Sequence, residues 1–351
     1  MPTYDFVTLR SRLHMGASKW TALESAGVTN PDVIPFSVAD MDLLVAPEII
    51  AALQSAAAFG VYGYTGMDEA FRAALTAWME RRHGWQVDPG WLANPLRRTD
   101  YGYELDLNHL EDLCRRPETK LLLLCSPHNP TGRVWTREEL KAIADLCRRH
   151  NVLIFSDEIH CDFIAPGHTH TVLATLDEET AHRCIMGTSA SKTFNLAGLA
   201  TATTIIPDQD LRRQFRAKTD GYTGSFSGYF GLAATRVAYE QGEPWLSALM
   251  EHLKGNFDLC RSFLADRFPS VWTAPWEGTY LLWADFSSLG LDPEAQMRFM
   301  RDEAGLWLDE GTMFGPEGAG FERFVLACPR HHLEKALERL DAAAARRGLP
   351  R

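Results

Sequence analysis

The sequence predicts an α/β protein, with a large lobe built on a mostly parallel sheet flanked by helices and a smaller α+β lobe at the C-terminal end. Two apolar runs, residues 120–125 and 151–155, have the composition of strands that are buried on both faces of a parallel sheet. The residues between them predict a helix over 136–150, which starts with a capping box formed by Thr136 and Glu139. Strand, helix and strand in this order form a right-handed crossover unit.

The remaining periodicity places the other elements. We expect helices at 47–59, 68–83, 245–268, 293–304 and 332–347, and strands at 184–187, 202–206, 278–285 and 324–327. We expect three parts: an N-terminal arm over 1–42 that packs with the small lobe, a large domain over 43–245, and a small C-terminal domain over 246–351.

Composition and charge exclude several classes of protein. The chain has 351 residues, 46% of them hydrophobic, which is enough for two packed lobes. Its net charge of −11 argues against nucleic acid or an anionic membrane as a partner. The seven cysteines are scattered, with no CxxC pair and no metal-ligand spacing. There is no apolar run of about 18 residues and no signal peptide, so we expect a cytoplasmic protein.

Polar motifs follow three of the predicted strands. Asn129 lies in the run Ser-Pro-His-Asn-Pro-Thr-Gly, Asp157 in Ser-Asp-Glu-Ile-His, and Lys192 in Thr-Ser-Ala-Ser-Lys-Thr. Open α/β sheets place ligands at the carboxyl ends of their strands, where all three motifs are expected. Taken singly, Asn129 and Asp157 are also consistent with turn residues, and Lys192 with a surface lysine. Together, in this order and on these elements, they predict one site.

Lys192 has the surroundings that a reactive lysine needs. A tight, partly dry turn lowers the pKa of a lysine and directs its amine toward a carbonyl carbon. The hydroxyls of Ser189 and Ser191, with nearby backbone N–H groups, suit the oxygens of a phosphate.

These motifs carry a resemblance to a known family. The chain resembles the cystathionine β-lyase and cysteine-S-conjugate β-lyase branch of the class I/II aminotransferases, which are pyridoxal-phosphate enzymes of fold type I. The resemblance runs from about Tyr4 to the C-terminal helix. Its other marks are the segments 38–42 (VADMD), 62–65 (YGYT), 81–85 (RRHGW), 126–135 (SPHNPTGRVW), 156–162 (SDEIHCD) and 327–330 (ACPR). The sequence Asp-Glu-Ile-His favours the lyase branch.

The resemblance implies a role for each matching residue. It makes Lys192 the Schiff-base lysine, Asp157 the partner of the pyridine nitrogen, and Asn129 the donor to the phenolic oxygen, with His160 within reach of the same atom. Ser189 and Ser191 belong to the phosphate-binding run. Tyr64 reaches the cofactor of the neighbouring subunit, and Arg323 binds the substrate carboxylate. A protonated pyridine ring is an electron sink, and a buried carboxylate keeps it protonated. The cofactor is therefore expected to be pyridoxal 5′-phosphate, held in a homodimer, with a small amino acid as substrate and no metal.

One departure from the family is large. After Leu92 the chain lacks several dozen residues that family members carry, including a helix start that holds the phosphate, an aromatic residue that stacks on the ring, and about two sheet strands. We expect this deletion to weaken cofactor binding and to expose apolar side chains at the neighbouring strands. Two smaller departures are Ala200, where many aminotransferases have a phosphate-binding arginine, and Val325, where the family usually has an asparagine.

The resemblance predicts a carbon–sulfur β-lyase. Such an enzyme eliminates a thiol from cystathionine or a cysteine S-conjugate and releases pyruvate and ammonia. An aminotransferase that uses the same residues is the alternative within enzymes. A catalytically impaired relative that acts by binding another protein is the alternative of another class, favoured by the deletion.

Overall fold

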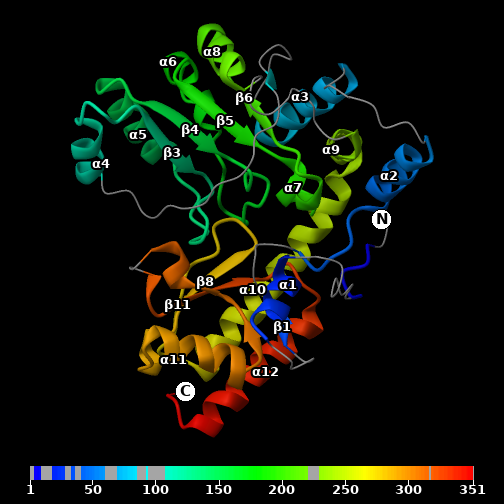
Figure 1. Cartoon of the computed structure of the whole chain (residues 1–351), viewed down its shortest axis with the longest axis vertical. Coiled ribbons are helices and arrows are strands. Elements are labelled where there is room, and N and C mark those ends of the chain that lie inside the picture. The colour runs from blue at the N-terminus through cyan, green and yellow to red at the C-terminus, as the bar shows by residue number, and fades with distance from the viewer. Residues whose placement is uncertain are drawn as a thin grey trace.

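The computed structural model of the chain describes residues 4–8, 18–27, 33–35, 41–59, 69–84, 92–93, 107–219, 229–315 and 318–350. Figure 1 shows two lobes, each a sheet with its helices, with the long helix α10 (Glu243–Arg267) running from one lobe into the other. These elements form an α/β structure, as predicted. The boundaries at residues 42 and 245 remain predictions.

The sheet of the large lobe has five strands in the order β2-β6-β5-β4-β3. Its strands are β2 (Leu92–Ala93), β3 (Leu121–Cys125), β4 (Leu153–Asp157), β5 (Cys184–Thr188) and β6 (Thr203–Ile205). The three strands β3, β4 and β5 are parallel neighbours, and β6 is antiparallel to β5 and to β2. The carboxyl ends of β3, β4 and β5 therefore meet at one edge of the sheet.

The helices predicted at 47–59, 68–83 and 136–150 are present in the large lobe as α2 (Pro47–Phe59), α3 (Glu69–His83) and α5 (Arg137–Arg149). The sequence did not predict the other helices of its described part, which are α4 (Leu107–Cys114), α6 (Glu178–Ala181), α7 (Ala190–Thr193), α8 (Gln209–Thr219) and α9 (Tyr229–Gln241), nor the 3-10 turns at Leu173–Thr175 and Ala197–Leu199. The predicted capping box is present at the start of α5, where Thr136 and Glu139 bond each other's backbone N–H. It fixes the crossover helix between β3 and β4.

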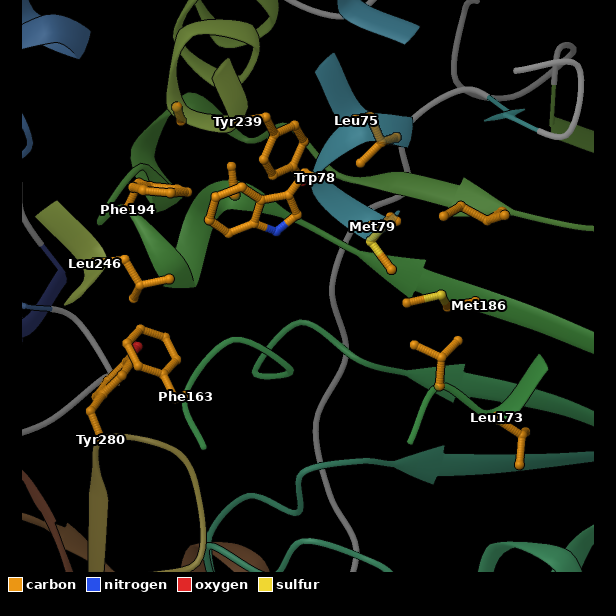
Figure 2. Close-up of a cluster of buried hydrophobic side chains, with 14 of the residues drawn as sticks. Leu75, Trp78, Met79, Phe163, Leu173, Met186, Phe194, Tyr239, Leu246 and Tyr280 are labelled. Atoms are coloured by element: carbon orange, nitrogen blue, oxygen red, sulfur yellow. The ribbon is translucent and has the colours of Figure 1, made fainter. Parts of the chain in front are cut away.

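A large apolar cluster holds α3 and α9 against the Lys192 segment. Figure 2 shows the indole of Trp78 beside Phe194 and Tyr239, and both ring pairs have centroids 5.5 Å apart. Phe194 also lies against the backbone at Gly242, where an added Cβ would meet its ring at 2.2 Å. Any larger residue at 242 would displace the ring that follows Lys192 by two positions.

The two faces of this sheet are covered unequally. Leu124 and Ile154 belong to the main hydrophobic cluster, which also takes in side chains of α3 and α5. On the opposite face, Leu121 and Leu123 of β3 are 45% and 63% exposed. The expectation that β3 is buried on both faces is therefore wrong: in the described part of the chain β3 pairs only with β4 and forms the sheet edge.

The small lobe has a four-stranded antiparallel sheet in the order β10-β11-β8-β7. Its strands are β7 (Trp272–Thr273), β8 (Leu281–Asp285), β10 (Asp309–Glu310) and β11 (Phe321–Val325), and its helices are α11 (Pro293–Arg298) and α12 (Arg330–Arg347). A second cluster of buried side chains lies between this sheet, α10 and α12. The N-terminal residues contribute α1 (Ser18–Ser25) and β1 (Ile34–Pro35), which pairs with β9 (Leu306–Trp307).

Local backbone geometry explains two differences from the predicted elements. The predicted strand 278–285 starts only at Leu281, because Thr279 has a φ of 63° in the left-handed region. The predicted helix 293–304 changes after Arg298 into a π-helical turn over Phe299–Glu303. No helix within the described ranges is both long and apolar enough to cross a membrane.

Candidate active site

The three strand-end motifs meet around one cavity of about 430 Å³. Six predicted site residues line it: Asn129, Asp157, His160, Ser189, Ser191 and Lys192. The structure brings them together because β3, β4 and β5 are adjacent and parallel, so the loops that follow them share one edge of the sheet. Tyr64, the remaining residue of the predicted cofactor set, lies outside the described residues.

Lys192 lies on the short helix α7 and is 4% exposed. Ser189 caps this helix: its hydroxyl accepts from the backbone N–H of Ser191 at 3.0 Å and donates to the carbonyl of Thr201 at 2.6 Å. The single hydroxyl proton of Ser189 is therefore used to hold the turn. Ser191, at the cavity wall, is the better placed of the two serines to meet an anion.

Asp157 ends β4 and faces the cavity, where it is partly exposed. Its neighbour Glu158 points the other way and is fully buried, with Oε1 accepting from Ser156 at 2.8 Å and Oε2 2.7 Å from Nε2 of His170. Only the first carboxylate of this pair can meet a ligand in the cavity.

His160 is buried with its ring against apolar surfaces. The ring packs edge-on to Tyr280 with centroids 5.5 Å apart. Another buried histidine, His128, has a hydrogen bond to Thr131 at 2.8 Å. Burial, with a smaller contribution from Arg133, lowers the pKa of His128 to about 4, so its imidazole is neutral near pH 7.

Arg323 joins the small lobe to this cavity. It lies on β11, and its Nη1 donates to Oδ1 of Asn129 at 2.7 Å. A guanidinium has no acceptor, so the Asn129 atom that faces it must be the carbonyl oxygen. The amide N–H groups of Asn129 are consequently directed away from Arg323 and can serve as donors to another group.

Two residues that the sequence did not single out hold this arginine. Asp309 accepts from Nη2 of Arg323, and the ring of Phe314 lies 4.8 Å from the guanidinium carbon. Among the described residues, Nε of Arg323 is buried without a hydrogen-bond partner. The arginine thus keeps an unused donor, which suits a carboxylate. Phe314 lies in the glycine-rich loop over residues 311–320, and Asp309 lies in β10 just before it.

The cavity also has a largely apolar part of its wall. This part includes Leu123, Phe155, Ala200, Ala202 and Thr204. Thr204 was not predicted; its hydroxyl is buried and has no hydrogen-bond partner among the described residues. Ala200 has a φ of 49° and presents only a methyl group.

The sequence model described as "Aminotransferase class I and II" matches residues 95–340. The chain belongs to this family. It is 33% identical to "Cystathionine beta-lyase PatB" of Bacillus subtilis, over 97% of this chain and 99% of that protein. It is 31% identical to "Protein MalY" of Escherichia coli, over 95% of this chain and 97% of that protein. The predicted superfamily and branch are confirmed.

Solved structures confirm the predicted fold as well. The structure of cystalysin from Treponema denticola, which contains pyridoxal 5′-phosphate, aligns with a TM-score of 0.92 at 33% identity. The alignment covers 98% of this chain and all of that one. The chain therefore has the fold of the pyridoxal-phosphate-dependent transferases.

The comparison with PatB also bears on chain length. The alignment spans 387 positions, whereas this chain has 351 residues. At least 36 positions of the alignment therefore hold no residue of this chain. The family match begins at residue 95, soon after the predicted junction at Leu92. The chain therefore lacks residues that are present in PatB. That they are missing after Leu92 remains a prediction.

Proposed function

We propose that the chain is a pyridoxal-phosphate-dependent carbon–sulfur β-lyase, which acts on cystathionine or cysteine S-conjugates and releases a thiol, pyruvate and ammonia. The observation that carries the proposal is the meeting of Lys192, Asp157 and Asn129 at one cavity, with Arg323 bound to Asn129. The names of PatB and of related carbon–sulfur lyases support the same chemistry.

The donor set suits the ring end of the cofactor. Asp157 is a carboxylate at the cavity wall, fit to hold a proton on a pyridine nitrogen. Asn129 has its N–H groups directed away from Arg323 and can donate to the phenolic oxygen, with His160 beside it. Lys192 supplies the amine that binds the aldehyde. At the phosphate end we assign Ser191, with Ser189 holding the turn on which it lies.

When bound, the cofactor supplies an electron sink that stabilises negative charge at the substrate α-carbon. The residues of the chain do the rest. Arg323 binds the substrate carboxylate through the donors that Asn129 and Asp309 leave unused. Nζ of Lys192 removes the α-proton and holds it. Departure of the β-thiolate completes the elimination, and water hydrolyses the released 2-aminoacrylate to pyruvate and ammonia. Asp157 keeps the ring nitrogen protonated throughout.

Two further parts of the proposal concern assembly and place. We assign Tyr64 to the neighbouring subunit's site in a homodimer, following the family, and we assign the protein to the cytoplasm. Sedimentation of the purified protein tests the first assignment, since a fully active monomer would exclude it.

The direct test compares the wild-type protein with Lys192→Ala and with Lys141→Ala. Lys141 is a surface lysine on α5, so its replacement controls for the loss of a lysine. With cystathionine and pyridoxal phosphate, the wild type and Lys141→Ala should release pyruvate and a thiol, and Lys192→Ala should release neither. Borohydride reduction should attach the cofactor to Lys192 in the wild type and in Lys141→Ala.

The products separate the alternatives. Transfer of the amino group to an added 2-oxo acid, without release of a thiol, would identify an aminotransferase instead. Cofactor attachment at a lysine other than 192 would exclude the assignment of this site. A wild type that neither binds the cofactor nor turns over any substrate would support the impaired, protein-binding relative.

A further inference from the structure

Lys192 is carried by a helix too short to hold its own orientation. The helix α7 has four residues, a single turn, and such a turn has no cooperative stability of its own. Side chains around it must therefore fix the lysine. Ser189 anchors the turn before Lys192, and Asn195 anchors it beyond, where its Nδ2 donates to the carbonyl of Leu43 at 2.8 Å. The third anchor, Thr193, directly follows the lysine.

Thr193 is bound to a buried carboxylate. Its hydroxyl donates to Oδ2 of Asp162 at 2.7 Å, and the two residues are 0% and 4% exposed. A hydrogen bond to an ionised acceptor in a dry site is among the stronger ones in proteins. It attaches the turn of Lys192 to the loop that follows β4.

Asp162 is held from its other side by the end of α3. Nε2 of His83 lies 3.0 Å from Oδ1, and Nη2 of Arg82 donates to the backbone carbonyl of Asp162 at 3.2 Å. Burial alone would raise the pKa of Asp162, but the hydrogen bond from His83 and the charge of Arg82 outweigh it, so the pKa is lowered. The carboxylate is therefore ionised and fixed when it receives the hydroxyl of Thr193.

The same helix also supports the Lys192 segment through apolar contact. Trp78 lies about one turn before Arg82 on α3, and its ring packs on Phe194, as Figure 2 shows. Phe194 follows Thr193 in the chain. Helix α3 thus contacts the lysine turn twice, through Trp78 and Phe194 and through His83 and Asp162.

The position of Asp162 in the sequence gives this contact a consequence for the site. Asp157 is the last residue of β4, and Asp162 follows it by five residues in the loop after that strand. One short segment therefore carries both the carboxylate assigned to the ring nitrogen and the carboxylate that holds the turn of Lys192. Movement of Asp162 would change the distance between the lysine amine and Asp157.

The cluster is not arranged as a metal site. Donor atoms of His83, Cys161 and Asp162 lie within 4.8 Å of one another. Both oxygens of Asp162 are already hydrogen-bonded, and Nε of Arg82 lies 3.8 Å from one of them, which would repel a cation. Burial raises the pKa of Cys161 well above its usual value, so the thiol keeps the proton that a metal would have to displace.

We propose that Asp162, acting through Thr193, is a positioning residue for Lys192, which it holds in the orientation that the proposed elimination requires. This inference rests on the proposed function. The residue touches neither substrate nor cofactor, and it acts by fixing the turn that carries the amine.

The test uses Thr193→Val, which removes the hydroxyl and keeps the shape, and Thr193→Ser, which restores the hydroxyl. The matched control is Thr180→Val, because Thr180 is also a buried threonine beside an aspartate: Asp177 accepts from the backbone N–H of Thr180 at 2.8 Å at the start of α6, away from the cavity. The readout is the rate at which pyridoxal phosphate and borohydride label Lys192, measured by peptide mass spectrometry across pH. We expect Lys192 in Thr193→Val to be labelled about ten times more slowly than in the wild type, or to a smaller final extent, and the pH midpoint of the labelling rate to shift. Thr193→Ser and Thr180→Val should behave as the wild type.

The outcomes separate this inference from the proposed function. If the wild type labels Lys192 and Thr193→Val does so at the same rate and pH midpoint, the positioning role is excluded and the function stands. If the wild type labels no lysine at saturating cofactor, the proposed function fails and the positioning role fails with it. Should Thr193→Val lose its thermal transition, Thr193→Ala supplies the same comparison without a branched side chain.

Discussion

The two faces of the large-lobe sheet differ in what covers them. One face takes Leu124 and Ile154 into a cluster with α3 and α5. The other face presents Leu123 at 63% exposure, and Phe155 beside it lies outside both hydrophobic clusters. Parallel sheets ordinarily bury both faces. The difference shows that the support of the site comes from the covered side, where the network of Asp162 and the rings around Trp78 hold the turn of Lys192.

A deletion at the predicted place, after Leu92, would give the open face a physical reason. The resemblance places two strands and a phosphate-holding helix start at the junction after Leu92, and the alignment with PatB leaves at least 36 positions without a residue of this chain. The structure has β3 at the sheet edge in its described part, with Leu121 and Leu123 exposed. This agrees with the expectation that neighbouring strands would show apolar side chains.

The largest expected effect tests the two faces with neighbouring leucines of one strand. Leu124 is 4% exposed and Leu123 is 63% exposed. Truncating a buried leucine leaves a cavity, so Leu124→Ala should lower the free energy of unfolding by about 2–5 kcal/mol. Leu123→Ala should change it by less than about 1 kcal/mol, because its side chain already meets water. Urea unfolding of both variants checks this. Equal losses would mean that the second face is covered in solution.

The next effect concerns Asp157, at the carboxyl end of β4. If this carboxylate maintains the electron sink, Asp157→Ala should lower turnover about 10²–10³-fold, the scale of one preorganised electrostatic contact. Attachment of the cofactor to Lys192 should persist, since the anchors of α7 are untouched. Asp112→Ala, a change of the same kind at an exposed residue of α4, is the control. Near-normal turnover in the Asp157 variant would reduce that residue to a turn carboxylate.

The sequence predicted the strands β3 to β6 and the helices α2, α3 and α5 of the large lobe because their signals were local. The capping box of Thr136 and Glu139 and the apolar runs of β3 and β4 are patterns of neighbouring residues. The site was predictable for the same reason, since Asn129, Asp157 and Lys192 each follow a strand that periodicity identifies. The roles of these three residues in the reaction remain proposals.

Contacts between distant segments could not be derived in this way. Asp309 and Arg323 are 14 residues apart, and Thr193 and Asp162 are 31 apart, so no short motif pairs them. The exposure of β3 was also hidden, because a strand of leucines has the same sequence at an edge as in the middle of a sheet. The glycine-rich loop gave no sign that Phe314 packs on Arg323.

The covered sheet of the small lobe provides a smaller effect that depends on pH. Glu322, next to Arg323, is 1% exposed and accepts from Gln296 at 2.9 Å. Burial, reinforced by Glu310 and Asp309, raises its pKa from 4.5 to about 8. The folded state therefore binds a proton that the unfolded state has lost between about pH 4.5 and 8, and the free energy of unfolding falls as pH rises through this window.

Glu322→Gln removes the ionisable group, and with it the loss in the free energy of unfolding at high pH. It should stabilise the protein on the order of 1–3 kcal/mol at pH 9 and leave it unchanged near pH 4, where the wild-type side chain is neutral in both states. Urea unfolding at the two pH values measures the difference, with Glu338→Gln on the exposed side of α12 as the control. A gain that is the same at both pH values would show packing rather than ionisation as its cause.

The smallest expected effect is the most direct measure of the open side of the site. Each charge-assisted hydrogen bond to a phosphate contributes roughly 1.5–3 kcal/mol, so a complete phosphate pocket makes pyridoxal phosphate bind far more tightly than pyridoxal. In the described part of this chain, the proton of Ser189 is committed to Thr201, and Ser191 is the serine left to meet the phosphate. We therefore expect the dissociation constants of the two compounds to differ by about tenfold, or about 1.4 kcal/mol, which is close to the lower end of the contribution of a single such bond. Ser191→Ala should weaken the binding of pyridoxal phosphate and leave the binding of pyridoxal unchanged.

Absorbance titrations of the wild type with both compounds give the ratio of the two dissociation constants. If pyridoxal phosphate binds a thousandfold more tightly, a segment outside the described residues supplies the phosphate pocket, and the deletion after Leu92 has not removed it.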